Sequence, residues 1–270
     1  MTKILGTQQS IINIHLSDAG GKTVLRNIHT TPPFLIQKAL YPDVEYPKMA
    51  YVYIMSSSGG VLQGDRLDMQ IDIGPNTASH ITTQAATKVY GMEFGDASSK
   101  VAINLGAGSY LEFLPLQIIP YKDSRYYQDV KVSIAPDSML VYSEVISSGR
   151  VASGESFVMD ACRLKFQVFE HEKLVYTDVM NVEPKACRDL VMSSFGNKEN
   201  LGTVYLIGSK IKESTIKEMG LDHFGDPIGF SSLPGECGFV IRMLSNDSEK
   251  IFKMINHVAS KSRCAILAHI

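Results

Sequence analysis

The chain has 270 residues, of which 44% are hydrophobic and 20% are charged. This composition is ordinary for a globular protein with a core, and the length suits one large domain or two small ones. The formal net charge of −2 excludes a global positive field that would attract nucleic acid or an anionic membrane.

Alternation of apolar and polar residues with a period of two begins near the start of the chain. SIINIHL is followed by Gly20-Gly21 and TVLRNI, which predicts a hairpin. YVYIM (51–55) is a β-rich run, and LDMQIDIG (67–74) predicts a strand with its apolar residues facing inward. Further strands are expected in ASHITTQ (78–84), SKVAINLGAGSYLEFL (99–114), DVKVSIAPDSMLVYSEV (129–145), ESFVMDACRLKFQVF (155–169) and KLVYTDVM (173–180).

The connections and the few helices complete this pattern. The turns GPNT, GAGS and APDS each lie between two expected strands, but the strands show no strict sequence repeat. SEKIFKMINHVASKS (248–262) has helical apolar spacing, with Asn246 and Glu249 as a capping box. A weaker helix is expected in 210–220, ending at Gly220, and 181–200 reads as mixed loop and helix. The sequence therefore predicts one mainly β domain over residues 1–270, a sandwich or coiled sheet, with helices towards the C-terminus.

The segment SSSGGVLQGDR (56–66) has the glycine spacing of a phosphate-binding loop. However, Asp65 and Arg66 stand where such a loop needs Lys and then Ser or Thr. A strand is expected to leave the segment, so no helix N-terminus would face an anion. The nucleotide interpretation is therefore rejected. Two interpretations stay open for Asp65: it caps a turn through its own side chain, or it presents a carboxylate beside a close approach of backbone.

Other chemical signals in the sequence are sparse. His80 and His171 stand alone and are interpreted as structural. The four cysteines, Cys162, Cys187, Cys237 and Cys264, have no metal or redox spacing, so reduced and mostly buried thiols are expected. No nucleophile, base and orienting group can be assembled from sequence neighbours, and we expect no enzyme. The start, MTKILGTQQS, has no apolar signal region, and no stretch approaches the roughly 20 apolar residues of a membrane helix, so a cytoplasmic protein is expected.

Several segments together resemble the UreD (UreH) family of urease accessory proteins. In order, they are TPPFLIQKALYP, SSSGGVLQGDRLDMQIDIGPNTASHITTQAATKVYG, LEFLPLQIIPYKDSRY, VYSEVISSGRVASGESF and DPIGFSSLPGECGFVIRML. The collinear set covers most of the chain, and residues 181–225 are the least recognisable part. One departure is Gln63-Gly64, where the family often has two glycines before its acidic residue.

The resemblance implies a non-catalytic urease maturation factor with a β-rich, helically wound fold. Members of this family bind apo-urease and UreF, and through UreF they recruit the GTPase UreG. The assembly delivers nickel, and an interior water-filled passage has been proposed in the family as its route. The resemblance thus implies Ni²⁺ in transit with no tightly bound cofactor, and a UreD–UreF unit that could be doubled by symmetry.

The resemblance also suggests which residues would serve nickel transit. Asp65 matches the family's acidic position, Glu144 and Asp178 occupy comparable strand positions, and the ITTQAATK segment contributes Thr82, Thr83 and Lys88. Separated carboxylates would bind Ni²⁺ weakly enough to release it, whereas His or Cys cages would trap it. The structural alternative is that Glu144 and Asp178 pair with Arg150 or Lys88.

Two rival functions remain open at the level of the sequence. A carbohydrate-active hydrolase with a β-helical or sandwich fold would use Asp65, Glu144 and Asp178 as acid and base, about 5 to 10 Å apart. The absence of Trp weakens its sugar-stacking platform. A self-contained metallochaperone would need a His or Cys cluster that the sequence does not contain.

Overall fold

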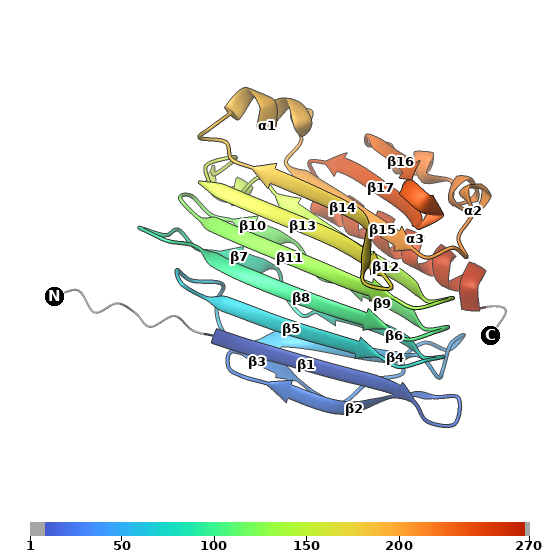
Figure 1. Cartoon of the computed structure of the whole chain (residues 1–270). Coiled ribbons are helices and arrows are strands. Elements are labelled where there is room, and N and C mark those ends of the chain that lie inside the picture. Colours follow the sequence, from blue (N-terminus) through green and yellow to red (C-terminus); the bar gives the residue numbers. More distant parts are fainter. Residues whose placement is uncertain (1–8, 268–270) are drawn as a thin grey trace.

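A computed structural model describes residues 9–267 as two stacked β-sheets with one long helix behind the second sheet (Figure 1). The N-terminal segment for which the sequence predicts no signal lies mostly outside the described residues. The seven-stranded sheet has the order β14 (Lys173–Val182), β13 (Ala161–Glu170), β11 (Arg125–Ile134), β8 (Ala97–Leu105), β5 (Arg66–Ile73), β1 (Gln9–Asp18) and β2 (Thr23–Thr30).

The second sheet has ten strands, and the long C-terminal helix packs on its outer side. Its main order is β16 (Ile228–Ser232), β17 (Gly238–Ser245), β15 (Asn200–Ile207), β12 (Met139–Ser147), β9 (Tyr110–Leu114), β6 (Ala78–Thr83), β4 (Ala50–Ser56) and β3 (Phe34–Ile36), with β7 (Thr87–Val89) and β10 (Ile118–Pro120) beside it. The helices are η1 (Val151–Ser153), α1 (Arg188–Ser194), α2 (Glu213–Glu218), η2 (Leu221–Phe224), η3 (Pro234–Glu236) and α3 (Ser248–Leu267).

The chain winds helically between the two sheets. From β4 to β13 it passes back and forth between them, so strands one coil apart become neighbours. These neighbours pair in parallel: β5 with β8 and β8 with β11 in the first sheet, β4 with β6 and β6 with β9 in the second. The mainly β, helically wound fold is therefore confirmed, as is the Gly20-Gly21 hairpin between β1 and β2.

One corner of the winding is built from the three expected turns. Asn76, Gly108 and Asp137 occupy the same place in GPNT, GAGS and APDS, with left-handed φ values of 55°, 66° and 59°. Glycine, asparagine and aspartate are the residues that accept this conformation most readily. The Asn76 N–H donates to the carbonyl of Ala107 at 3.0 Å, and the Gly108 N–H donates to that of Pro136 at 3.1 Å. The turns therefore stack on one another, although the strands between them share no sequence repeat.

The strand β12 is buried along its whole length, which period-two alternation alone does not indicate. Leu140 and Tyr142 face the other sheet, while Val141 and Val145 belong to the apolar cluster under α3. Both faces are covered, so polar residues of this strand also lose contact with water. In contrast, β5 alternates as predicted, with Met69, Ile71 and Ile73 buried and Leu67 half-buried.

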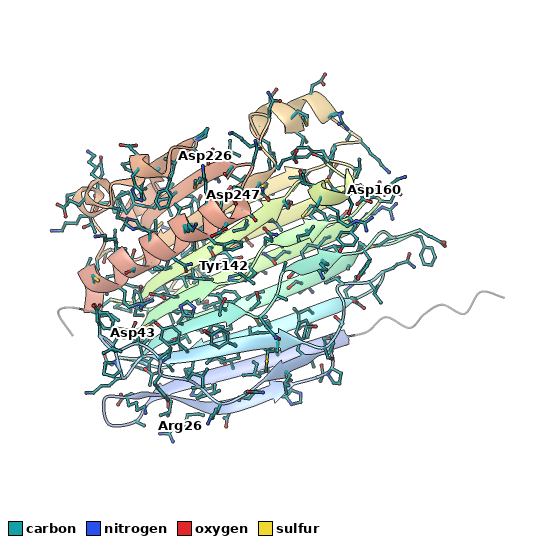
Figure 2. The ribbon with its side chains drawn as sticks, turned by 180° about the vertical axis from the view of Figure 1, so that it is seen from behind. Arg26, Asp43, Tyr142, Asp160, Asp226 and Asp247 are labelled. Atoms are coloured by element: carbon teal, nitrogen blue, oxygen red, sulfur yellow. The ribbon has the colours of Figure 1, made fainter. Side chains whose placement is uncertain are left out.

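The helix α3 confirms the C-terminal prediction but not its cap. Ile251, Ile255 and Val258 are buried on the ten-stranded sheet, as the spacing requires. The N-terminal cap is Asp247, whose Oδ1 accepts the backbone N–H of Glu249 at 2.8 Å. The predicted capping box with Asn246 is wrong, because the side chain of Asn246 instead accepts the backbone N–H of Glu199. Figure 2 shows Asp247 at one end of α3 and Asp43 near the other.

The remaining predictions on helices and cysteines have mixed outcomes. The segment 181–200 does contain loop and helix, and Gly220 follows α2 with a left-handed φ of 63°. Cys162 is buried and Cys237 half-buried, but Cys187 and Cys264 are exposed. The expectation of mostly buried thiols is therefore wrong, because both of these residues stand at solvent-facing positions beside or on helices. No helix within residues 9–267 is long and apolar enough to cross a membrane.

The contact between α3 and β15 gives a first prediction. A Cβ added at Gly202 would lie 2.3 Å from Cγ2 of Ile251, so Gly202→Ala forces the helix away from the sheet. We expect the free energy of unfolding to fall by about 1–3 kcal/mol, measured by chemical denaturation. Gly229→Ala is the matched control, since its Cβ meets nothing within 4 Å. Equal stability of the two variants would contradict the prediction.

Candidate functional site

The segment 57–65 connects two strands, β4 and β5, and no helix follows it. The Asp65 carboxylate accepts the backbone N–H of Leu62 at 2.8 Å, and Gly64 has a left-handed φ of 84°. A phosphate loop needs a helix N-terminus that is absent here, so its rejection is confirmed. The side chain of Asp65 does cap its turn, while its second carboxylate oxygen remains available for other contacts.

The loop around Asp65 lies against the segment before β8. The carbonyl of Gln63's side chain accepts the Phe94 N–H at 3.1 Å, and Arg66 pairs with Asp96 at 2.8 Å. Leu62 is 56% exposed and Phe94 is 60% exposed. The surface around Asp65 thus combines a carboxylate with two large apolar side chains that face solvent.

A pocket of about 110 Å³ extends from Asp65 into the space between the sheets. Its lining includes Leu67 and Gln128 from the seven-stranded sheet, and Thr83 and Tyr142 from the ten-stranded sheet. The volume has room for several water molecules. Figure 2 shows Tyr142 in the middle of the molecule, so the pocket reaches from the surface loop to the interior.

Glu144 lies beyond the inner wall of this pocket and is only 4% exposed. Its carboxylate accepts the Tyr142 hydroxyl at 2.8 Å and the Gln128 side-chain amide at 3.2 Å. Burial raises the pKa of Glu144 to about 7, against the lowering effect of these two hydrogen bonds, and the charge of Asp178 adds to the rise. The carboxyl group therefore changes its charge close to neutral pH.

Asp178 lies on the far side of Glu144, in a second and more open pocket of about 460 Å³. Its carboxylate pairs with Arg242 and accepts the hydroxyl groups of Tyr205 at 2.9 Å and Tyr176 at 3.3 Å. The rings of Tyr142 and Tyr205 stack at 5.9 Å. Burial and the two carboxylates raise the pKa of Tyr205, so its hydroxyl stays protonated and donates.

The alternative in which Glu144 and Asp178 pair with Arg150 or Lys88 is wrong. Arg150 pairs with Glu155, which follows it in the same loop. Lys88 is exposed on the short strand β7 and lies outside the lining of the pocket. Asp178 finds its cation in Arg242 instead, since β14 and β17 bring the two side chains together from positions 64 apart in the sequence.

The two threonines point to opposite faces of β6. Thr83 lines the pocket, and its hydroxyl accepts the backbone N–H of Leu116 at 2.9 Å. Thr82 donates to the carbonyl of Leu114 at 2.7 Å and lies on the outer face, because successive side chains of a strand alternate. The structure therefore brings Asp65, Thr83, Glu144 and Asp178 towards one interior line, and it leaves Thr82 and Lys88 outside.

Four residues of this line were missed by the sequence reasoning: Gln128, Tyr142, Tyr205 and Arg242. Tyr142 had a signal, since it stands two residues before Glu144 and so shares its face of the strand. The other three come from separate strands, and only the winding of the chain places them here. Together with Thr83, they complete a set that we name the interior polar line: Asp65, Thr83, Gln128, Tyr142, Glu144, Tyr205, Asp178 and Arg242.

A second polar cluster lies on the outer face of the ten-stranded sheet, under α3. Glu112 is fully buried, and Arg263 holds both its oxygens at 2.8 Å. His80 Nδ1 lies 2.7 Å from the same carboxylate, and the Tyr110 hydroxyl donates to it at 2.8 Å. Arg263 also pairs with Asp43. This arrangement supports the structural interpretation of His80, although the residue is not isolated.

Within residues 9–267 no group of three His, Cys, Asp or Glu side chains is arranged to hold a metal ion. The interior polar line offers single carboxylate and phenol oxygens, spaced along its length. Such oxygens suit transient and hydrated contacts with a divalent cation better than a closed site.

Comparisons with known proteins agree on one family. The family model described as UreD urease accessory protein matches residues 8–269. A urease accessory protein UreD of Cenarchaeum symbiosum is 37% identical over 259 residues, covering 94% of this chain and 91% of the relative. A protein named urease accessory protein UreD 2 of Brucella canis is 34% identical, covering 90% and 82%, and one of Streptomyces griseus is 33% identical, covering 89% and 84%. The chain therefore belongs to the UreD family of urease accessory proteins.

Proposed function

We propose that the chain is a non-catalytic scaffold that binds apo-urease and UreF, recruits UreG through UreF, and passes nickel towards the urease active site. Membership of the family supports the role in urease maturation. The observation that carries the finer proposal is the interior polar line, in which the stacked rings of Tyr142 and Tyr205 lie between the pocket beside Asp65 and the pocket beside Asp178. Nickel is cargo in this proposal, and no cofactor resides in the chain.

The chemistry of the interior polar line suits an ion that must move on. Carboxylate and phenol oxygens hold Ni²⁺ less tightly than imidazole or thiolate ligands do. The carboxyl group of Glu144 lies between the two pockets and has a pKa of about 7. It can therefore exist in a charged form that attracts a cation and a neutral form that releases it.

The partners would meet the chain where the line reaches its surface. Leu62 and Phe94 expose large apolar side chains beside Asp65, and contiguous apolar surface commonly marks a protein interface. At the other pocket, Val179 is 45% exposed next to Asp178. The cytoplasmic location and the doubling of a UreD–UreF unit by symmetry belong to this proposal as well.

The hydrolase alternative has no comparable support. It needs two carboxyl groups that flank an open cleft, whereas Glu144 is buried and Asp178 is already bound by Arg242 and two tyrosines. The names of the relatives describe accessory proteins. We therefore retain the scaffold as the proposed function.

The experiment separates the turn-capping role of Asp65 from its charge. Asp65→Asn keeps an oxygen that can accept the Leu62 N–H but removes the charge, while Asp65→Ala removes both. Each variant is coexpressed with urease and its other accessory proteins, and nickel per urease and urease activity are measured. We expect both variants to copurify with UreF and urease but to lower nickel loading severalfold.

Asp18→Ala serves as the control, because Asp18 is an exposed carboxylate at the opposite end of the same sheet. Normal nickel loading in both Asp65 variants would remove the transit role. Loss only in Asp65→Ala would assign the effect to the turn. Failure of every form, including the unaltered chain, to copurify with UreF or urease would overturn the scaffold proposal itself.

A further inference from the structure

Two histidines meet on the outer side of the molecule, where η2 packs against α3. The ring centroids of His223 and His257 are 5.2 Å apart, and the ring planes are inclined at 75°. His223 is exposed and His257 is half-buried. The pair lies outside the interior polar line and takes no part in the proposed function.

Backbone carbonyls fix which nitrogen of each ring carries hydrogen. His223 Nδ1 bonds to the carbonyl of Gly220, and His257 Nε2 lies 2.7 Å from the carbonyl of Met219. A carbonyl oxygen can only accept, so both of these ring nitrogens must donate. In the neutral rings, the lone pairs therefore lie on His223 Nε2 and His257 Nδ1.

This arrangement is the one that supports metal-binding histidines in other proteins. A ligating imidazole commonly donates its second N–H to a carbonyl or carboxylate, which sets the tautomer and the orientation of the ring. Here two consecutive carbonyls, from Met219 and Gly220, perform this task for both rings. Gly220 can turn the chain between them because it adopts a left-handed φ of 63°.

The spacing of the rings matches a shared ion. With a metal–nitrogen distance of about 2.0–2.1 Å, each ring centroid lies roughly 3.2 Å from the metal, and a tetrahedral angle then places the two centroids roughly 5 Å apart. The observed 5.2 Å agrees with this value. Imidazole is a ligand that suits nickel, zinc and copper.

We propose that His223 and His257 form a two-histidine site for a borderline divalent transition-metal ion. Two protein ligands leave the other coordination positions to water, so the ion is reached from solvent and exchanges readily. The competing explanation is an edge-to-face contact of two neutral rings, which requires no metal. The two explanations differ in what the free nitrogens do when metal is added.

The test uses the full chain and Zn²⁺ or Ni²⁺ alone. Isothermal titration calorimetry measures the metal affinity of the unaltered protein, of His223→Ala and of His257→Gln. The glutamine keeps a polar side chain on α3. His171→Ala is the matched control, because His171 is also exposed but stands at the β13–β14 hairpin. We expect each site variant to weaken binding at least about tenfold, since the loss even of an outer-shell partner costs about 10- to 100-fold, and the control to bind as before.

Nitrogen-15 spectra of the histidine rings give a readout that does not depend on folding of a variant. We expect His223 as the Nδ1–H tautomer and His257 as the Nε2–H tautomer, with Zn²⁺ shifting His223 Nε2 and His257 Nδ1 together. Binding unaffected by either substitution would overturn the proposal. The proposal would also be overturned if Zn²⁺ left the signals of His223 Nε2 and His257 Nδ1 unchanged. The two rings would then form an aromatic contact only.

Discussion

Replacing Glu144 by glutamine is expected to stabilise the protein and at the same time to impair nickel delivery. The carboxyl group is buried, and its pKa rises from the ordinary 4.5 to about 7. Between pH 4.5 and pH 7, the folded state therefore still holds the Glu144 proton, whereas the unfolded state has released it. Stability consequently falls as pH rises from about 4.5 to about 7, and the full cost persists above pH 7.

Glutamine removes this cost because it cannot ionise. The pKa difference corresponds to about 3 kcal/mol, so at pH 8 we expect Glu144→Gln to unfold with a free energy up to about 3 kcal/mol higher than the unaltered chain. Below pH 4.5 the two proteins should be equally stable. The measurement is urea denaturation at several pH values, with Glu218→Gln, an exposed glutamate on α2, as the control. Parallel stability curves across this range would contradict the prediction.

The same variant tests the role of the charge inside the protein. Tyr142 and Gln128 can still donate to the amide oxygen of a glutamine, so the packing between the sheets should persist. Copurification with UreF and urease is expected to be unchanged, while nickel per urease falls. If Glu144→Gln is more stable but loads nickel into urease normally, the charge of Glu144 has no role in nickel transit.

The largest loss of stability is expected from Arg263→Ala. Burial would raise the pKa of Glu112, but the hydrogen bonds of His80 and Arg263 outweigh it and hold that pKa below its ordinary value. Without the guanidinium, a fully buried carboxylate and Asp43 lose their common cation. Breaking a buried pair from one side costs about 3–5 kcal/mol, which is a large part of the 5–15 kcal/mol typical of a domain.

The control for this prediction lies on the same helix. Lys253 pairs with Glu249 one turn away at 2.8 Å, with both side chains mostly exposed, so Lys253→Ala should leave the stability nearly unchanged. Arg263→Lys should recover only part of the loss, since an ammonium group cannot bind the carboxylate with two parallel hydrogen bonds. Chemical denaturation of the three variants, Arg263→Ala, Arg263→Lys and Lys253→Ala, measures their free energies of unfolding. A loss below about 1 kcal/mol in Arg263→Ala would contradict the prediction.

Local sequence signals predicted most of the fold. The alternation in 67–74, the glycine hairpin and the helix 248–262 each depend on neighbours in the chain. The turns GPNT, GAGS and APDS were recognised one by one, but their stacking depends on strands about 30 residues apart. The capping residue of α3 was missed by one position because Asn246 bonds to Glu199 instead.

The site was predicted less completely because its contacts are long-range. Asp65 and Glu144 could be named as candidates, yet the partners that determine their chemistry come from other strands. Glu112 and Arg263 are 151 positions apart, and neither carried a signal in the sequence. Thr82 and Lys88 were drawn from the same short segment as Thr83, but alternation on β6 and the exposure of β7 direct them elsewhere.

The stacked turns GPNT, GAGS and APDS hold successive coils of the chain at a constant distance from one another. Each coil adds one strand to each sheet, at about 4.8 Å per strand. The loop that carries Asp65 precedes β5, and Gln128 lies on β11, two strands away in the same sheet. Two strand spacings amount to roughly 10 Å. The number of coils therefore determines this part of the distance between Asp65 and Glu144. Duplication or deletion of one whole coil would lengthen or shorten this route by a single step and leave the corner hydrogen bonds in register.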